Sequence, residues 1–76
     1  MKLYAGGYLT FYMPEQKPEI EWALSEPVAL CDMLKELGIP VAEVQLVIIN
    51  GEIADIKQAQ INNQDIVKAF PGVDGG

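Results

Sequence analysis

A single stretch of this chain has the spacing of an amphipathic α-helix, and this stretch limits the folds that the remaining residues can adopt. Ser25 or Glu26 suits the N-cap and Pro27 suits the first turn, so the helix is predicted to begin there. Gly38 suits a left-handed C-cap, and Pro40 lies just beyond it. One apolar stripe recurs at i, i+3, i+4 and i+7, formed by Leu30, Met33, Leu34 and Leu37.

Two segments before this helix have the residue types of β-strands. Residues 2–5 and 8–12 favour strand, and Gly6-Gly7 between them leaves one kinked strand and a strand followed by a loop both open. Residues 13–18 contain two prolines and indicate a turn. Residues 19–24 alternate polar and apolar side chains, which predicts a half-buried strand antiparallel to the first. Its apolar face consists of Ile20, Trp22 and Leu24.

Three further strands are predicted after the helix. Residues 44–49 are nearly all apolar and β-branched, which is typical of a central strand covered on both faces. Asn50-Gly51 is a strong hairpin signal, and residues 52–56 form the expected return strand. Ile61 is expected to anchor a polar segment to the core, and residues 66–70 form the last strand.

The predicted order of strands and helix defines one small α+β domain. A chain of 76 residues suits one domain, which we expect to span residues 1–70, with residues 71–76 as a flexible tail. The helical crossover allows the first and last strands to lie side by side and parallel at the centre of the sheet. A mixed four- to five-stranded sheet packed on one main helix is the β-grasp, or ubiquitin-like, fold.

The charge of the chain argues against several classes of partner. The net charge is −6, with five lysines, no arginine and no histidine. Such a surface repels phosphates, so we expect neither nucleic acid nor membrane as a partner, and a basic protein surface is the better complement. No signal peptide and no apolar run of about 20 residues is visible, so we expect a cytoplasmic protein.

The residues offer little chemistry of their own. Cys31 is the sole cysteine, lies in the predicted helix and has no histidine to activate it, so an inert packed thiol is expected. No cluster has metal-ligand spacing and no glycine-rich loop precedes a helix, so we expect no bound metal or cofactor and no enzyme activity. Trp22 is expected in the core, or alternatively as an interface anchor.

Three segments resemble the MoaD/ThiS family of ubiquitin-like sulfur carriers. Residues 27–40 look like the family's helix with its Leu-Gly-Ile-Pro type of stop. Residues 43–51 are similar to the strand that ends in Val-Asn-Gly. Residues 70–76 look like the Phe-Pro-Pro-Val-x-Gly-Gly terminus of the molybdopterin synthase small subunit.

The chain also departs from this family in three places. Gln64-Asp65 stands where the family usually has a Gly-Asp pair before the last strand. Asn63-Gln64 is therefore expected to make that turn, since Asn63 tolerates left-handed geometry. Gly72 replaces the second proline of the tail. Thr10 stands where an arginine is common near the first strand.

The resemblance implies that the chemistry takes place on the Gly76 carboxylate. A ubiquitin-activating-type adenylyltransferase would use ATP to adenylate it, and sulfuration would convert it to a thiocarboxylate. Gly75 and Gly76 have no side chains, so they suit a narrow channel in the partner enzyme. Phe70, Pro71 and Val73 are the expected partner-binding residues, although Phe70 suits the core equally and the tail suits a frayed terminus.

Several functions remain open at this point. The Phe-Pro pair favours molybdopterin biosynthesis, with the large subunit of molybdopterin synthase or another sulfur-accepting enzyme as partner. A thiazole- or cysteine-pathway carrier uses the same activation chemistry, as does a protein modifier that is joined through Gly76 to a lysine. A plain interaction module, which would not need a free terminus, is a further alternative.

Overall fold

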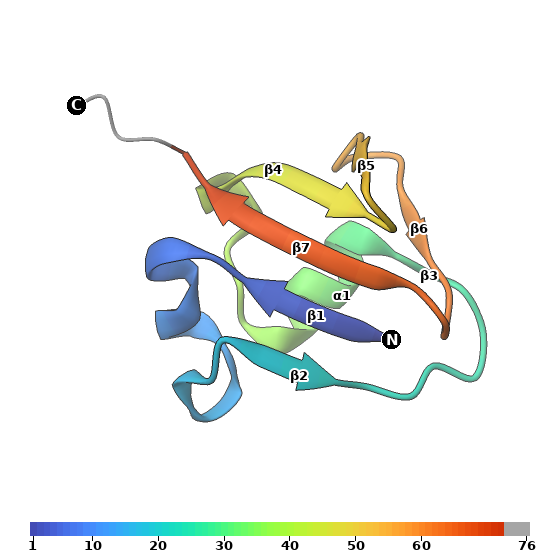
Figure 1. Ribbon diagram of the computed structural model, residues 1–76, viewed down its shortest axis with the longest axis horizontal. Helices are drawn as coiled ribbons and strands as arrows, with labels where there is room; N and C mark the ends of the chain where they lie inside the picture. Colours follow the sequence, from blue (N-terminus) through green and yellow to red (C-terminus); the bar gives the residue numbers. More distant parts are fainter. Residues whose placement is uncertain (73–76) are drawn as a thin grey trace.

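A five-stranded mixed sheet covered on one face by a single α-helix forms the body of the molecule (Figure 1). The computed structural model describes residues 1–72. The strands follow the order β2-β1-β7-β4-β5, and β3 and β6 form a separate two-stranded ladder. The elements are β1 Lys2–Ala5, β2 Glu19–Glu21, β3 Val28–Ala29, α1 Leu30–Leu37, β4 Val44–Ile49, β5 Glu52–Ala54, β6 Gln60–Ile61 and β7 Ile66–Pro71.

The sheet has the predicted β-grasp topology. β1 and β7 lie side by side and parallel, with Leu3 opposite Val67, while β2 and β4 flank them in antiparallel fashion. Parallel neighbours need a crossover connection, and α1 lies in the part of the chain that connects the β1–β2 pair to the strands β4, β5 and β7. The fold prediction is therefore confirmed, including the parallel central pair and β2 antiparallel to β1.

The core lies between α1 and one face of the sheet. The helix contributes Leu30, Met33 and Leu34, all buried, and Leu37 packs half-buried at their edge. Gly38 ends the helix in the left-handed conformation, with a φ of 88°, and its N–H bonds the carbonyl of Lys35 at 3.0 Å. The helix of residues 30–37 is much too short to cross a membrane, and no other helix of residues 1–72 is long and apolar enough to do so.

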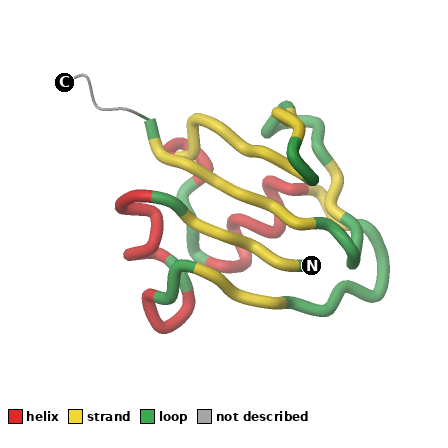
Figure 2. The backbone as a smooth tube through the Cα atoms, viewed as in Figure 1, coloured by secondary structure: helices red, strands yellow, loops and turns green. Residues whose placement is uncertain are grey.

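Of the two alternatives for residues 2–12, a single kinked strand is wrong, because β1 ends at Ala5 and residues 8–12 form no strand in spite of their strand propensity. After β1 the chain forms a 3₁₀ helix over Gly7–Tyr12, which Figure 2 shows as the helical segment that follows β1. Leu9 and Met13 are buried, whereas Tyr8 and Phe11 are exposed, so the apolar contacts recur every four residues rather than every two. The strand propensity of the aromatic residues is overridden by these contacts with the core.

The helix also begins later than predicted. We expected its start at Ser25-Glu26-Pro27, but α1 begins at Leu30, with Ala29 as an N-cap that offers no side-chain bond. Residues 28–29 instead pair with β6, and the Leu30 N–H bonds the carbonyl of Ala59 at 3.0 Å. The β6 segment was not predicted, although Ile61 is fully buried as expected. Pairing with β6 satisfies the backbone groups that an earlier helix start would have used.

β4 is not the doubly covered central strand that its apolar run suggested. β7 occupies the centre of the sheet, and β4 lies between β7 and β5. Val44 and Val47 face the core, but Leu46 is 36% exposed on the uncovered face. The unbroken apolar run thus has one buried face and one open face.

The Asn50-Gly51 hairpin is confirmed, and it also positions the start of β7. Both residues have positive φ, 52° and 86°, as a primed turn requires. The Asn50 amide donates to Asp65 Oδ1 at 2.9 Å and accepts from the Ile66 N–H at 2.9 Å. Residues 62–65 form the next turn, in which the Asp65 N–H donates to the Asn62 carbonyl at 3.0 Å and the Asn62 N–H donates to Asp65 Oδ2 at 2.8 Å. Asn63 does not use the left-handed geometry that was expected of it.

Candidate functional site

The C-terminal end of β7 is where the sequence placed the candidate site. β7 runs to Pro71, which pairs with Val44 at the start of β4, and Gly72 follows next to Gln45. The described residues therefore end at the end of the central strand (Figure 1), and we call this end of β7 the exit of the chain. The predicted site residues Val73, Gly75 and Gly76 lie outside the described residues.

The face of the sheet opposite α1 is largely apolar, and we call it the open sheet face. Strand register places its residues in neighbouring rows across the sheet. One row crosses all five strands: Ile53, Ile48, Lys68, Tyr4 and Glu19. The flanking rows contain Leu46 opposite Phe70 on one side and Ile66, Lys2 and Glu21 on the other.

Sequence reasoning missed this face as part of the site. Tyr4 is 39% exposed and Ile66 is 49% exposed, and both line a shallow hollow with Lys68 and Phe70. The signal was present in the apolar run 44–49, but we interpreted it as burial on both faces. An uncovered apolar sheet face next to the exit of the chain is a surface suited to a protein partner.

Phe70 belongs to the open sheet face and not to the core. It alternates with the buried Val67 and Ala69 along β7, so its side chain points away from α1. Its ring lies 6.4 Å from the Tyr4 ring, centroid to centroid, at an angle of 56°. Pro71 is half-buried at the end of the same strand. The structure thus brings Phe70 and Pro71 together at the exit of the chain, where a partner can reach Phe70.

Glycines allow close packing around this exit. A Cβ at Gly6 would lie 2.6 Å from Phe70 Cδ1, and a Cβ at Gly7 would lie 2.9 Å from Pro71 Cγ. Gly6 also donates its N–H to the Ala69 carbonyl at 2.8 Å. The Gly6-Gly7 pair, predicted as a bulge or strand end, is therefore needed because β1 and β7 leave no room for side chains there.

The contact between Gly6 and Phe70 yields a stability prediction. Gly6 has a φ of −89° and a ψ of 161°, which alanine adopts without strain, so the cost of Gly6→Ala arises from the collision alone. We expect this substitution to reduce the free energy of unfolding by about 1–3 kcal/mol. In a Phe70→Ala background the same substitution should be neutral or should stabilise by about 0.4–1 kcal/mol. Urea denaturation of the four proteins measures both values, and equal losses in the two backgrounds would rule out the collision.

The charges of the open sheet face differ from those of the chain as a whole. Two of the five lysines, Lys2 and Lys68, lie on it. Lys2 pairs with Glu19 at 3.2 Å, but within residues 1–72 Lys68 forms no salt bridge. A cation without an ionic partner in the middle of an apolar row is complementary to an apolar surface that carries a carboxylate.

The other residues singled out in the sequence lie away from this exit. Cys31 is half-buried, and its thiol donates to the Ile56 carbonyl at 3.2 Å. Among residues 1–72 no group of three or more histidine, cysteine, aspartate or glutamate residues is placed to hold a metal ion. Trp22 is half-buried at the edge of the core beyond the end of β2. Thr10 bonds the Ala5 carbonyl at 3.2 Å and so helps to hold the 3₁₀ segment against β1.

Comparison with known proteins agrees with the fold. No curated protein matches the chain. The family model described as Mut7-C ubiquitin matches residues 2–74, which is nearly all of the chain. The match supports a ubiquitin-like family and does not single out the MoaD/ThiS carriers, and it ends before Gly75 and Gly76. The chain belongs to the Mut7-C ubiquitin family.

Proposed function

We propose that this protein is a sulfur carrier whose reactive group is the carboxylate of Gly76. The observation that carries the proposal is the order of residues at the exit of the chain. The central strand ends in Phe70-Pro71 next to the uncovered apolar face, and the sequence then continues to Gly75-Gly76. A partner enzyme docked on the open sheet face would have the end of the chain within reach, since six extended residues span roughly 20 Å.

The proposed chemistry proceeds in two steps on the partner enzyme. A carboxylate oxygen of Gly76 attacks the α-phosphorus of ATP, the bond to pyrophosphate breaks, and an acyl adenylate forms. Hydrosulfide then attacks the acyl carbon, and AMP leaves as the carbon–oxygen bond breaks. The product is a thiocarboxylate, whose sulfur is the nucleophile that attacks an acceptor. ATP is thus a substrate of the adenylyltransferase partner, and the carrier supplies only the carboxylate.

The molybdopterin pathway is the favoured destination of the sulfur. This preference rests on the likeness of Phe70-Pro71 and the double glycine to the terminus of the molybdopterin synthase small subunit. The position of Phe70 on the open sheet face supports it, because a half-buried aromatic ring at the exit suits an interface with a large synthase subunit.

Intact-mass spectrometry of the untagged protein from its own cells tests the proposal. The net charge of −6 permits purification by anion exchange without a tag. A species whose mass reflects one sulfur-for-oxygen exchange, located to Gly76 by fragmentation, is the expected result. Lysine-linked adducts through Gly76 would show a protein modifier instead. A chain that continues past Gly76 in the mature protein would contradict both functions.

The absence of a side chain at Gly75 provides a second prediction. Gly75→Ala places a methyl group next to the reacting carbonyl, and a misplacement of about 1 Å can cost about 100-fold in rate. We expect sulfur transfer to fall by about this factor, while the urea midpoint stays unchanged. Gly51→Ala in the hairpin is the control. The added methyl group meets no atom within 4 Å, so the substitution acts only through the backbone, which a φ of 86° strains when a side chain is present. That variant should lose stability and retain transfer.

A further inference from the structure

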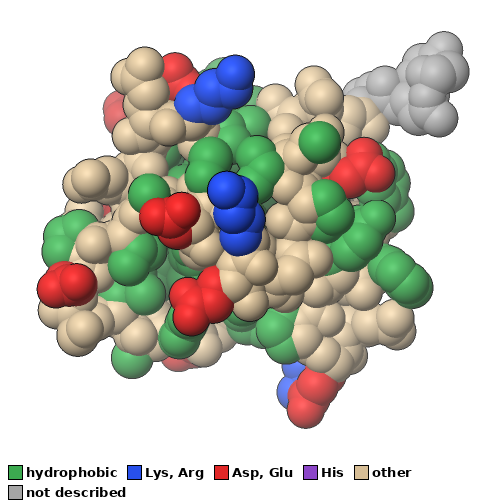
Figure 3. Space-filling model, turned by 180° about the vertical axis from the view of Figure 1, so that it is seen from behind, with side chains coloured by type: hydrophobic (Ala, Val, Ile, Leu, Met, Phe, Trp, Pro, Cys, Tyr) green, Lys and Arg blue, Asp and Glu red, His purple; other side chains and the backbone are tan. Residues whose placement is uncertain are grey.

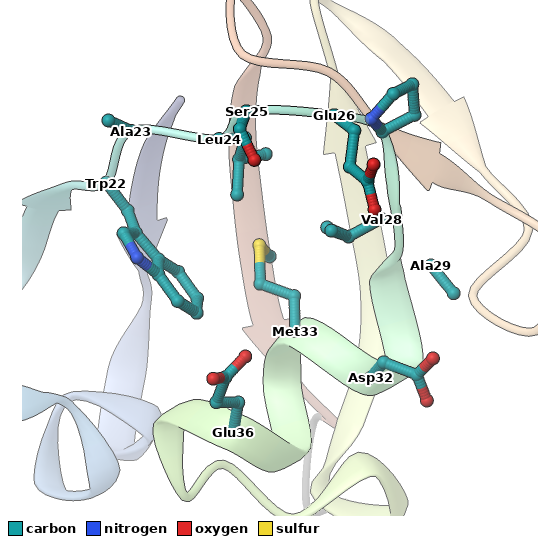
Figure 4. Close-up of a pocket in the computed structure, with 11 residues that line it drawn as sticks. Trp22, Ala23, Leu24, Ser25, Glu26, Val28, Ala29, Asp32, Met33 and Glu36 are labelled. Carbon is teal, nitrogen blue, oxygen red and sulfur yellow. The ribbon is translucent and has the colours of Figure 1, made fainter.

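A pocket of mixed polar and apolar lining lies between α1 and the loop that connects β2 to β3, on the side of the sheet opposite the open sheet face. Its walls come from Trp22, Leu24, Val28 and Met33. Figure 4 shows the Met33 side chain projecting from α1 towards the loop, with the Trp22 ring to one side and Val28 to the other. We call this cavity the Trp22 pocket. It has a volume of about 420 Å³, which is in the range of ligand-binding pockets.

Three carboxylates surround the Trp22 pocket, and no lysine lines it. Glu26 comes from the loop, and Asp32 and Glu36 come from α1. All three are exposed, and within residues 1–72 none of them forms a salt bridge. Figure 3, which views the helix side, shows acidic side chains next to apolar surface on this face. The pocket therefore combines an apolar floor with an uncompensated negative rim.

The loop that forms the pocket is held at both of its ends by backbone hydrogen bonds. The Trp22 N–H bonds the Met1 carbonyl at 2.8 Å, and the Leu24 N–H bonds Asn63 Oδ1 at 2.8 Å. At the other end, the β3–β6 pairing fixes residues 28–29. A ligand would therefore meet a formed pocket and would not have to order the loop, which lowers the cost of binding.

We propose that the Trp22 pocket binds an arginine side chain presented by an apolar segment of a protein partner. The aliphatic stem of arginine would pack on Met33 and Leu24. Its planar guanidinium would stack on the Trp22 indole and donate to the carboxylate of Glu36, which lies on the same side of Met33 as the indole, while Glu26 on the other side adds negative charge (Figure 4). Residues 1–76 contain no arginine, so neither this segment nor a second copy of it can supply the side chain.

The chemistry of the rim argues against other occupants. A nucleic acid would be repelled by the three carboxylates. Lysine would match the charge, but its compact ammonium neither stacks on indole as a plane nor bonds a carboxylate with two parallel donors. No metal-binding group of three or more residues is present in the described part of the chain.

The Trp22 pocket is remote from the exit of the chain. The β2–β3 loop lies at the opposite side of the molecule from the end of β7 (Figure 1). A partner in the pocket would leave the open sheet face and the end of β7 accessible. This inference therefore does not depend on the sulfur-carrier proposal, and the two can succeed or fail separately.

The single tryptophan makes the test direct. Trp22 is the only tryptophan of the chain, so a ligand that stacks on it changes the whole intrinsic fluorescence. The probe is the blocked peptide Ser-Leu-Arg-Leu-Ser, and its control replaces arginine by citrulline, which has nearly the same shape without the charge. We expect saturable binding of the arginine peptide with a Kd of the order of 10⁻⁴ M. We also expect weaker binding as NaCl rises from about 0.05 M to about 0.5 M.

Substitutions distinguish binding to the carboxylates of the pocket from general attraction of the peptide to an acidic protein. The double variant Glu26→Gln with Glu36→Gln should weaken binding about tenfold or more, since the charge-assisted hydrogen bond to Glu36 becomes neutral and the charge of Glu26 is removed. Glu52→Gln removes an exposed charge on β5, does not line the pocket and should leave the Kd unchanged. Urea denaturation checks that all three proteins remain folded.

Four results would overturn the inference. The first is equal binding of the citrulline peptide, and the second is an equal loss of affinity in Glu52→Gln. The third is equal affinity for arginine amide alone, which would indicate a small-cation site. The fourth is self-association of the free protein in sedimentation experiments that disappears in the double variant, because a second copy would then be the occupant.

Discussion

We expect a chain that is extended by two residues beyond Gly76 to lose formation of the acyl adenylate completely. The extension turns the reactive carboxylate into a peptide bond, which has no anionic oxygen to attack the α-phosphorus of ATP. The loss arises because the only terminal carboxylate of the extended chain is displaced by two residues, about 7 Å when extended, from the position that the Gly76 carboxylate occupies in the partner enzyme. It should therefore exceed the roughly 100-fold effect expected from a misplaced group.

Pyrophosphate exchange measures this loss directly. The native chain and the extended chain are added in turn to extract from the source cells, and ATP–pyrophosphate exchange is followed with each. An extension that a protease removes directly after Gly76 provides the matched control, because cleavage should restore exchange. Exchange by the uncleaved chain at the native rate would refute activation at Gly76, and it would favour an interaction module that needs no free terminus.

The second large effect is expected in the core, where Leu34→Ala should reduce the free energy of unfolding by about 2–5 kcal/mol. Leu34 is fully buried at the centre of the helix stripe, in contact with the cluster that includes Leu3 and Val67. A small domain buries only about 60% of its unfolded surface, so it has little stability to spare. The loss should lower Tm by about 10 °C or more.

An exposed residue of similar size is the control for this substitution. Ile53 is 78% exposed on β5, so Ile53→Ala removes apolar atoms that are already largely in water. Its cost should stay within about 0.5 kcal/mol. Urea denaturation compares the two variants, and similar losses for Leu34 and Ile53 would contradict the assignment of the helix stripe to the core.

The open sheet face and the Trp22 pocket suggest two independent uses of one small domain. The open sheet face is apolar with Lys68 at its centre and adjoins the exit of the chain. The Trp22 pocket is acidic at its rim and lies on the other side of the sheet. The two surfaces thus require partners of different charge, which would keep the partners from competing for one surface.

Periodic patterns accounted for the parts of the fold that were predicted well. The helix stripe from Leu30 to Leu37, the Gly38 stop and the Asn50-Gly51 hairpin depend on neighbouring residues, so local sequence is sufficient to define them. The number of predicted strands and the position of the helix among them permit few sheet topologies. The rules for strand connections then favour the β-grasp topology.

The secondary-structure predictions were wrong where a contact with a distant segment determines the local conformation. Residues 28–29 continue no helix because β6, some 30 residues away in sequence, pairs with them. Residues 8–12 have strand propensity, but Leu9 and Met13 are drawn into the core on a helical repeat. Neither conformation can be predicted from neighbouring residues alone, because contacts between distant segments override local secondary-structure propensity.

Some features of the fold and of the candidate site depend on local sequence, and others depend on tertiary packing. The sequence by itself determined the helix, the hairpin, the strand order and the Phe-Pro and double-glycine ending, because each depends on local residue types or on their order along the chain. Only the tertiary structure decided that Phe70 lies on the open sheet face, that Gly6 makes room for its ring, and that Trp22 meets Glu36 at one pocket. These features arise from packing between segments far apart in the chain, and no local pattern encodes which face of a strand remains uncovered.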